Sequence, residues 1–371
     1  MTEPDFVPIV PRRITQLADL VGASRVARVT TVAQRLLERV GPRTLWHVNS
    51  TATGGGVAEM LHALLGYVVD LGVETRWVVI DADGDFFALT KRLHNRLHGA
   101  PTGHGFDDAD RSLFDAVSAR NADTLVAAVR PGDMVVLHDP QTAGLAPALV
   151  KHGATVVWRC HIGIDRQTPV SLDAWDFLRA DILPAQAHVF SRATYRPDFL
   201  PAATTAVIPP SIDPFAIKHQ ELDAPTVIAI LQAAGLLVGK PDCPPVYAAR
   251  DGSSAVVVRG AEVVADELPR PGVPLAAQVS RWDRLKDMAG VMKAFAEHVV
   301  PSGPGYLILA GPQINGVADD PEGAEVYNEC LTAWRELPLD ARRRVMLANL
   351  PMADVDENAV MVNALQRYAT V

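Results

Sequence analysis

The chain has 371 residues, 49% of them hydrophobic and 21% charged, which is typical of a soluble globular protein of about two domains. Its net charge of −9 argues against a nucleic-acid or anionic-membrane surface, because either would favour a basic face. The cysteines form neither a zinc spacing nor a disulfide framework, and no apolar run is long enough to span a bilayer. We therefore expect a cytoplasmic protein without nucleic-acid or membrane partners.

Short apolar runs alternate with helical patterns in the first part of the chain. Most of these runs are bounded by Gly, Pro, Asp or Asn, as strands commonly are. Strands that alternate with helices indicate a parallel sheet with helices on both faces, so residues 1–217 are predicted to form a Rossmann-like domain. The predicted strands are 45–48, 76–80, 134–137, 155–158 and 206–208.

Residues 218–274 are rich in Pro and Gly and are predicted to be a connection with an inserted excursion. The alternation then resumes, and residues 275–371 are predicted to form part of a second Rossmann-like domain. A doubly wound domain normally has five or six strands, so this domain is predicted to be incomplete. The expected strands are 275–279, 306–309 and 345–348, and the expected helices are 287–299, 323–336 and 358–368.

Three consecutive glycines, Gly54, Gly55 and Gly56, separate the first of these strands from a helix that is expected to begin near Val57. Glycines at this point let the backbone approach a ligand and leave the first helical N–H groups free to meet an anion. The spacing matches neither a dinucleotide fingerprint nor a phosphate loop. A tight turn that needs left-handed residues explains the glycines equally well.

A second strand-to-helix turn carries two cations, Arg281 and Lys286. Both follow the strand 275–279, at the carboxyl end where open α/β sheets bind ligands. A guanidinium and an ammonium there could neutralise a diphosphate, but a solvated, charged helix start has equal weight. Asp287 is expected at the beginning of the next helix under either interpretation.

Two histidines follow neighbouring predicted strands. His138 and Asp139 come after the strand 134–137, and His161 comes after the strand 155–158. Loops that follow parallel strands open at the same edge of a sheet, so these residues are expected beside the glycine turn. Each histidine alone is more typical of a structural role, whereas the two together favour a ligand site.

Three polar residues, Lys91, His94 and Asn95, are spaced to share one helix face. That face is either solvated surface or a surface that hydrogen-bonds sugar hydroxyls. The acidic run before it, residues 81–85, lacks the Gly and Glu positions of a calcium loop and is interpreted as a turn. No metal site is predicted.

In these segments the sequence resembles the trehalose glycosyltransferring synthases, within the large family 4 of retaining glycosyltransferases. That family has the GT-B fold, which consists of two Rossmann-like domains. The likeness keeps its order from about Leu45 to the end of the chain and is weakest between Lys218 and Pro274. The segments that carry it are 45–60, 86–95, 138–141, 157–161, 208–214 and 279–287.

The resemblance implies retaining transfer of glucose from a nucleoside-diphosphate glucose to glucose, which gives trehalose, with no metal or other cofactor required. By similarity, the expected catalytic residues are His161 beside the donor sugar and Arg281 and Lys286 on the leaving diphosphate. The three glycines of the turn are expected beside the donor diphosphate and the acceptor. The candidates for acceptor contacts are Lys91, His94, Asn95, His138 and Asp139.

Three interpretations stay open at this point. The protein is a trehalose synthase, a trehalose phosphorylase of the same fold, or a non-catalytic sugar-binding remnant. Family members carry a further strand and a glutamate-containing donor motif, which are expected beyond Val371, so the chain is expected to lack part of the donor site. Its activity when taken alone is therefore open. The expected partners are sugars and a nucleotide-sugar, and an open sheet edge leaves a homodimer as a further expectation.

Overall fold

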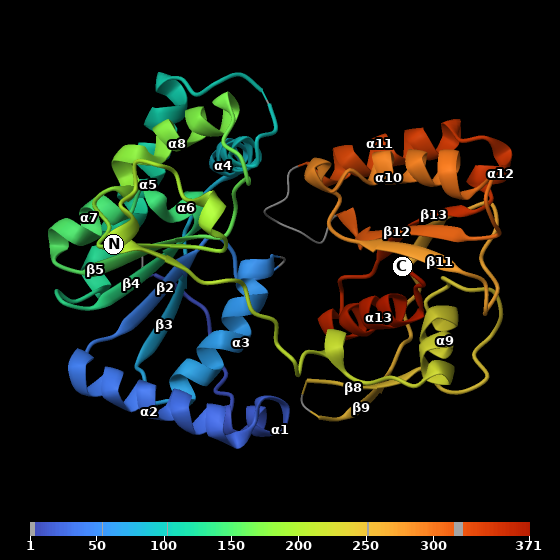
Figure 1. Cartoon of the computed structure of the whole chain (residues 1–371), viewed down its shortest axis with the longest axis horizontal. Coiled ribbons are helices and arrows are strands. Elements are labelled where there is room, and N and C mark those ends of the chain that lie inside the picture. The colour runs from blue at the N-terminus through green and yellow to red at the C-terminus, as the bar shows by residue number, and fades with distance from the viewer. Residues whose placement is uncertain (1–3, 54, 102, 251, 315–321) are drawn as a thin grey trace. The chain divides into compact units, whose positions relative to one another are not determined.

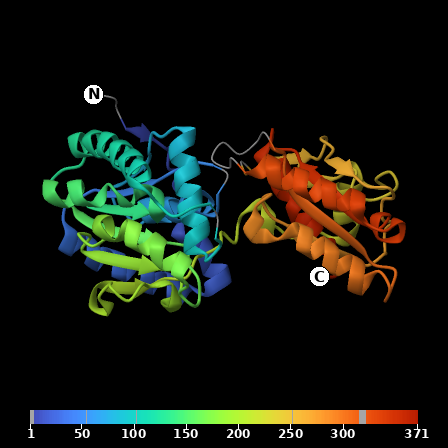
Figure 2. The same ribbon diagram turned by 90° about the horizontal axis from the view of Figure 1, so that it is seen from above.

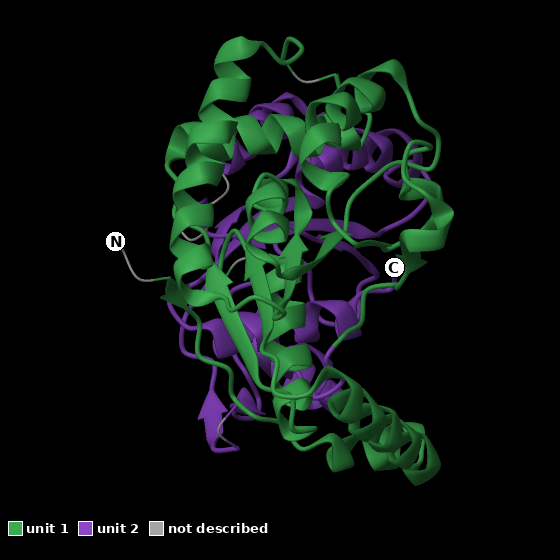
Figure 3. Cartoon of the chain, turned by 90° about the vertical axis from the view of Figure 1, so that its left-hand side faces the viewer, with its two compact units in different colours: residues 1–212 green, residues 213–371 purple. Residues whose placement is uncertain are grey.

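The computed structural model describes residues 4–53, 55–101, 103–250, 252–314 and 322–371. The chain divides into two compact units, residues 1–212 and 213–371, which Figure 3 distinguishes by colour. Each unit has its own sheet and its own hydrophobic clusters.

The first unit is built on a seven-stranded sheet with the order β1-β3-β2-β4-β5-β6-β7. The pairs are parallel except at one edge, where β1 runs antiparallel to β3. The five predicted strands are confirmed as β2, β3, β4, β5 and β7, whereas β1 and β6 were missed. The bounds are β1 Asp5–Phe6, β2 Leu45–Asn49, β3 Thr75–Val79, β4 Met134–His138, β5 Thr155–Cys160, β6 Ala187–Phe190 and β7 Thr205–Val207.

Helices cover both faces of this sheet, as Figure 1 shows, with α4 to α8 on one side and α2 and α3 on the other. Strand side chains alternate between the two faces. Trp46 and Trp158 consequently pack in the large core cluster with α4 to α8, whereas Trp77 packs against α3. The helices are α1 Ala18–Val21, α2 Ala23–Val40, α3 Gly56–Asp70, α4 Gly84–Leu97, α5 Asp108–Ala128, α6 Asp139–Ala143, α7 Ala146–His152 and α8 Pro169–Ile182.

A buried carboxylate holds the turn that precedes β4. Asp133 accepts N–H groups from the backbone of Thr44 and of Arg130, each at 3.0 Å. It also accepts the indole N–H of Trp46 at 3.1 Å. Burial raises the pKa of Asp133, but these hydrogen bonds outweigh burial, so the pKa lies below its ordinary value of 3.8.

Replacing Asp133 by alanine is expected to lower the free energy of unfolding by about 3 kcal/mol near neutral pH, because three N–H groups lose their acceptor. A pKa that is lowered in the folded state gives stability that is present above the unfolded pKa and is lost as the pH falls through the folded pKa. The difference in the free energy of unfolding between wild type and Asp133→Ala should therefore become smaller at acidic pH. Urea unfolding in neutral and acidic buffer measures it, with the exposed Asp123→Ala as control. A gap that stays constant with pH would contradict this account.

The second unit contains a four-stranded sheet with the order β10-β13-β12-β11, in which β10 is antiparallel and the other pairs are parallel. Its strands are β10 Glu262–Val264, β11 Leu275–Val279, β12 Tyr306–Pro312 and β13 Val345–Leu350. Its helices are α9 Ala224–Ala233, α10 Met288–Ala294, α11 Gly323–Glu336, α12 Leu339–Arg342 and α13 Val355–Tyr368. The core of this unit forms two clusters, one on each face of the sheet. Ile308 of β12 packs with α9 and α13 in one cluster, and its neighbour Leu309 packs with α10 and α11 in the other.

Residues 218–274, predicted to be a connection, instead contribute to the body of the second unit. Val227, Ile230 and Leu231 of α9 are buried in its core, and β10 pairs along β13. The predicted excursion corresponds to a separate hairpin of β8 Val246–Ala248 and β9 Ser254–Val256. These elements are short, and prolines and glycines lie close to them in the sequence. Their apolar patterns were therefore too brief to be recognised from the sequence alone.

Backbone groups cover both edges of the parallel part of this sheet. At one edge β10 pairs with β13. At the other edge, next to β11, Thr370 N–H donates to the Leu275 carbonyl at 2.8 Å and Ala277 N–H donates to the Val371 carbonyl at 2.9 Å. Thr370 and Val371 therefore pair with β11. The predicted incompleteness of the domain stays a prediction.

Candidate functional site

The carboxyl ends of β2, β4 and β5 form a common edge in the first unit. The three strands are parallel neighbours, and their register pairs His47 with Val136 and His138 with Arg159. Residues paired in register point to the same face, so His47, His138 and Arg159 share a face. That face is opposite to the one on which Trp46 and Trp158 enter the main core.

Three histidines are hydrogen-bonded in a row at this edge. Nδ1 of His47 lies 3.0 Å from Nε2 of His138, and Nδ1 of His138 lies 3.2 Å from Nε2 of His161. The rings are close to parallel, with interplanar angles of 23° and 17°. His47 and His138 are buried and His161 is partly exposed. The structure therefore brings together two predicted site residues, His138 and His161, and adds a third.

His47 was not predicted as a site residue, although its position within the strand 45–48 is visible in the sequence. His47 lies inside a predicted strand, where a polar residue among apolar ones is easily taken for a structural one. The alternation of side chains along β2 and β4, combined with the strand order, puts His47 and His138 on the same face of adjacent strands. The strand order is what the sequence does not display.

All three rings are neutral. Burial, with a smaller contribution from the positive charge of Arg159, lowers the pKa of His47 and that of His161 to about 3. Burial and the neighbouring rings hold the pKa of His138 well below its usual value of 6.5. At neutral pH each ring consequently carries one N–H donor and one acceptor nitrogen.

Asp139, which begins α6, has an unusual backbone and holds the loop that contains His161. Its φ of 62° is left-handed, a region that aspartate enters more readily than most residues. Its Oδ1 accepts the backbone N–H of His161 at 2.7 Å, and its carbonyl accepts the indole N–H of Trp158 at 3.1 Å. Burial raises the pKa of Asp139 to about 7, although the His161 hydrogen bond and the Arg159 charge oppose the rise.

Two residues of the predicted glycine turn, Gly55 and Gly56, follow the carboxyl end of β2 at the beginning of α3. Gly54 is outside the described residues. Gly55 is extended, with φ −137° and ψ 155°, and a Cβ atom at Gly55 or Gly56 would meet nothing within 4 Å. Neither of these two glycines has a positive φ, so the left-handed-turn interpretation does not hold for them. What they provide is open backbone at the beginning of α3, with no side-chain cap on the helix.

Side chains hold the chain between β2 and this turn. The side chain of Asn49 accepts the indole N–H of Trp77 at 2.7 Å and donates to the Thr51 carbonyl at 2.6 Å. Nε2 of His62, from α3, lies 3.0 Å from the Ala52 carbonyl. The turn is therefore tied both to the sheet and to the helix that it precedes.

The three candidates on α4 are only partly on one surface. Lys91 and His94 are partly exposed, and the ring of His94 lies 4.8 Å from that of His98. Asn95 is 2% exposed, and its Oδ1 has no hydrogen-bond partner among the described residues. The expectation that the three residues share one exposed face is therefore wrong, because Asn95 points into the protein. The acidic run before α4 is a helix start, with Asp83 accepting the N–H of Phe86 at 3.0 Å.

In the second unit the predicted cations follow β11 as expected. The side chain of Arg281 is 32% exposed and lies 3.7 Å from Asp283, and Lys286 is exposed. Asp287 caps α10 by accepting the Gly290 N–H at 3.1 Å. The third cation of this turn, Arg284, is paired with carboxylates of Glu322, Glu325 and Glu329.

Beneath the cations, Trp282 anchors this loop to β12. It is buried, and its indole N–H donates to the Pro312 carbonyl at 3.1 Å. A Cβ atom at Gly311 would lie 2.6 Å from this indole, so only glycine fits there. The backbone that carries Arg281 is therefore packed directly against the neighbouring strand.

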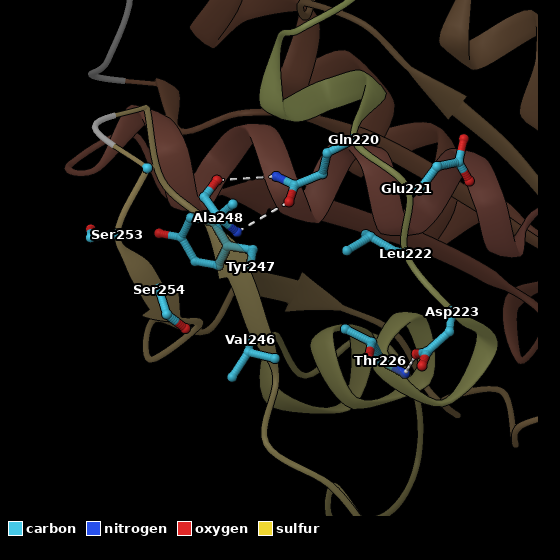
Figure 4. A pocket seen from close by; sticks show the side chains of 11 residues that line it. Gln220, Glu221, Leu222, Asp223, Thr226, Val246, Tyr247, Ala248, Ser253 and Ser254 are labelled. Carbon is cyan, nitrogen blue, oxygen red and sulfur yellow. Dashed lines mark hydrogen bonds between the residues drawn. The ribbon is translucent and has the colours of Figure 1, made fainter.

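A shallow pocket of about 380 Å³ also lies in the second unit, between the start of α9 and the β8–β9 hairpin (Figure 4). The amide of Gln220 spans its wall by bonding the N–H and the carbonyl of Ala248. None of its described lining residues is a predicted site residue. In the described part of the chain, no group of His, Cys, Asp and Glu is arranged to hold a metal, and no helix has the length and apolar character needed to cross a membrane.

The sequence is similar to those of several known proteins. Residues 47–197 match the family profile "Trehalose synthase, N-terminal domain". A trehalose synthase of Pyrococcus horikoshii is 29% identical over 361 residues, which cover 97% of this chain and 74% of that protein. One of Rubrobacter xylanophilus is 31% identical over 332 residues, which cover 87% and 65%. A trehalose phosphorylase of Pleurotus sajor-caju is 26% identical over 373 residues, which cover 93% and 47%.

The fold is similar to those of several solved structures. A trehalose-6-phosphate synthase matches with a TM-score of 0.60 at 13% identity, over 88% of this chain and 77% of that one. An E. coli structure bound with UDP-2-fluoro glucose matches with a TM-score of 0.61 at 14% identity, over 88% and 76%. At this identity the likeness concerns the fold, which is GT-B as the sequence predicted. The chain is a glycosyltransferase that is similar to trehalose synthases over nearly all of its length and matches their N-terminal domain at residues 47–197.

Proposed function

We propose that the protein transfers glucose from a nucleoside-diphosphate glucose to free glucose, with retention, and so forms trehalose. The observation that carries this proposal is the match of residues 47–197 to the trehalose synthase N-terminal domain, which contains the histidine row and its loops. The synthase relatives are also more similar to the chain than the phosphorylase, at 29% and 31% identity against 26%.

In the proposed reaction, the bond from the anomeric carbon to the diphosphate oxygen breaks as a bond to the acceptor oxygen forms on the same face. The acceptor proton passes to the leaving phosphate oxygen, so the reaction needs no protein nucleophile and no metal. Arg281 and Lys286 neutralise the charge that develops on the diphosphate. In the first unit, His161 contacts the donor sugar, and the open backbone at Gly55 and Gly56 lies beside donor and acceptor.

Acceptor recognition is proposed for the remaining polar residues of the first unit. Lys91 and His94 are partly exposed and can bond sugar hydroxyls, whereas the burial of Asn95 makes a direct contact less favourable. His138 is buried and Asp139 is occupied with His161, so both act through the loop and not by direct contact. We propose no cofactor.

Product analysis tests the proposed function. The purified protein is incubated with glucose and each of several nucleoside-diphosphate glucoses, and trehalose is the expected product. Trehalose incubated with inorganic phosphate serves as the parallel reaction, in which glucose 1-phosphate would identify a phosphorylase. Sugar binding measured by calorimetry without any product in either reaction would instead identify a non-catalytic binding protein.

A further inference from the structure

The row of three histidines has a property that none of its members has alone. His138 uses both ring nitrogens in the row, one toward His47 at 3.0 Å and one toward His161 at 3.2 Å. A neutral imidazole has a single hydrogen, so His138 must donate at one contact and accept at the other. The direction of one hydrogen bond therefore dictates the direction of the other.

Only two all-neutral arrangements satisfy both contacts. In the first, His47 donates from Nδ1, His138 donates from Nδ1, and His161 accepts at Nε2 and carries its hydrogen on Nδ1. In the second, His161 donates from Nε2, His138 donates from Nε2, and His47 accepts at Nδ1. Nδ1 of His161 is thus a donor in the first arrangement and an acceptor in the second.

The surroundings disfavour the charged alternatives that would break this rule. His47 and His138 are 6% and 1% exposed, so an imidazolium at either position would lose most of its hydration. The positive charge of Arg159, on the same face of the sheet, opposes a second positive charge in the row. The two hydrogen bonds of the row consequently reverse their donor and acceptor roles together or not at all.

We propose that His47 and His138 are positioning residues that select the tautomer of His161 through this row, and so decide whether its Nδ1 donates to or accepts from a ligand hydroxyl. The row itself is independent of the reaction. Only the identity of the ligand, a sugar with its hydroxyls, rests on the proposed function. His161 is the one member of the row that is partly exposed, and its Nδ1 has no partner among the described residues.

Nitrogen NMR of the protein labelled with ¹⁵N in its histidines tests this proposal without any assay of activity. Wild type is expected to show His161 in one predominant tautomer, with scalar coupling across the hydrogen bonds from His47 to His138 and from His138 to His161. Absence of these couplings in wild type would overturn the proposal, and this measurement needs no variant.

The variant His47→Phe removes the far end of the row but fills a similar volume. The ¹⁵N shifts of His161 are expected to move toward those of a mixture of tautomers, although His47 is not its neighbour. His47→Gln, whose amide can donate to or accept from His138, keeps a hydrogen-bond partner for His138 and is expected to move the His161 shifts less than His47→Phe does. His152→Phe is the matched control, since His152 bonds the Val129 carbonyl outside the row.

Unchanged His161 shifts in a folded His47→Phe protein would overturn the proposal. A loss of trehalose formation would not, because the readout is taken on the free protein. Conversely, the predicted NMR changes in a protein that makes no trehalose would support the row and contradict only the proposed function.

Discussion

Replacing Arg281 by alanine is expected to lower kcat/KM for glucose transfer by about 100- to 1,000-fold, the typical loss when one preorganised donor to a developing negative charge is removed. Arg281 follows the carboxyl end of β11, and its backbone is supported by the packing of Trp282 against Gly311. The guanidinium can contact two diphosphate oxygens at once, so lysine should restore the activity only in part.

Two other arginines of the second unit serve as controls for Arg281→Ala. Arg270 is exposed and precedes the amino end of β11, so Arg270→Ala should leave kcat/KM unchanged. Arg284 is occupied by three glutamates, so Arg284→Ala should have its main effect on stability. Steady-state kinetics, together with calorimetric binding of nucleoside diphosphates, measures the series. An Arg281→Ala protein with full activity would remove Arg281 from the diphosphate site.

Replacing Asp139 by asparagine is expected to change how stability depends on pH. The pKa of Asp139 is raised from its ordinary value of 3.8 to about 7 in the folded protein. A carboxyl whose folded pKa is raised stabilises the protein below its unfolded pKa, and this stability is lost as the pH rises through the folded pKa. The three-unit difference corresponds to at most about 4 kcal/mol, lost between about pH 4 and pH 7.

Asparagine cannot ionise, still offers an oxygen to the His161 N–H, and tolerates the left-handed backbone. The variant should therefore gain stability relative to wild type as the pH rises through this range. Urea unfolding in buffers from about pH 4 to pH 8 measures the difference, and Asp123→Asn, at an exposed position, should show none. A difference that is flat with pH would mean that Asp139 ionises normally.

Much of the fold could be predicted because its strands are short and apolar between clear breaks. β2 and β4 were found almost to the residue. β6, with the sequence Ala-His-Val-Phe, was not predicted, because the histidine interrupts its short apolar run. β10 is recognisable only from its pairing with β13, which is a contact distant in sequence.

The candidate site was predicted in part for a similar reason. His138 and His161 stand at strand ends, where sequence position alone indicates the ligand-binding edge. His47 lies beside His138 because of the register between β2 and β4. Asn95 does not contribute to the exposed surface of α4, because its side chain is buried. Burial and register depend on tertiary structure, so a single sequence does not reveal them. The roles of Arg281 and Lys286 stay predictions.

The neighbouring residues Trp46 and His47 give β2 a fixed alignment against its partners. Trp46 enters the main core and His47 enters the histidine row on the opposite face. A one-residue slip of the strand would turn the imidazole into the core and the indole toward His138. An insertion or deletion in β2 should therefore cost both stability and the arrangement of the row, whereas loops far from this edge should accept changes in length. The alignment of one five-residue strand couples the folding of the first unit to the chemistry at its edge.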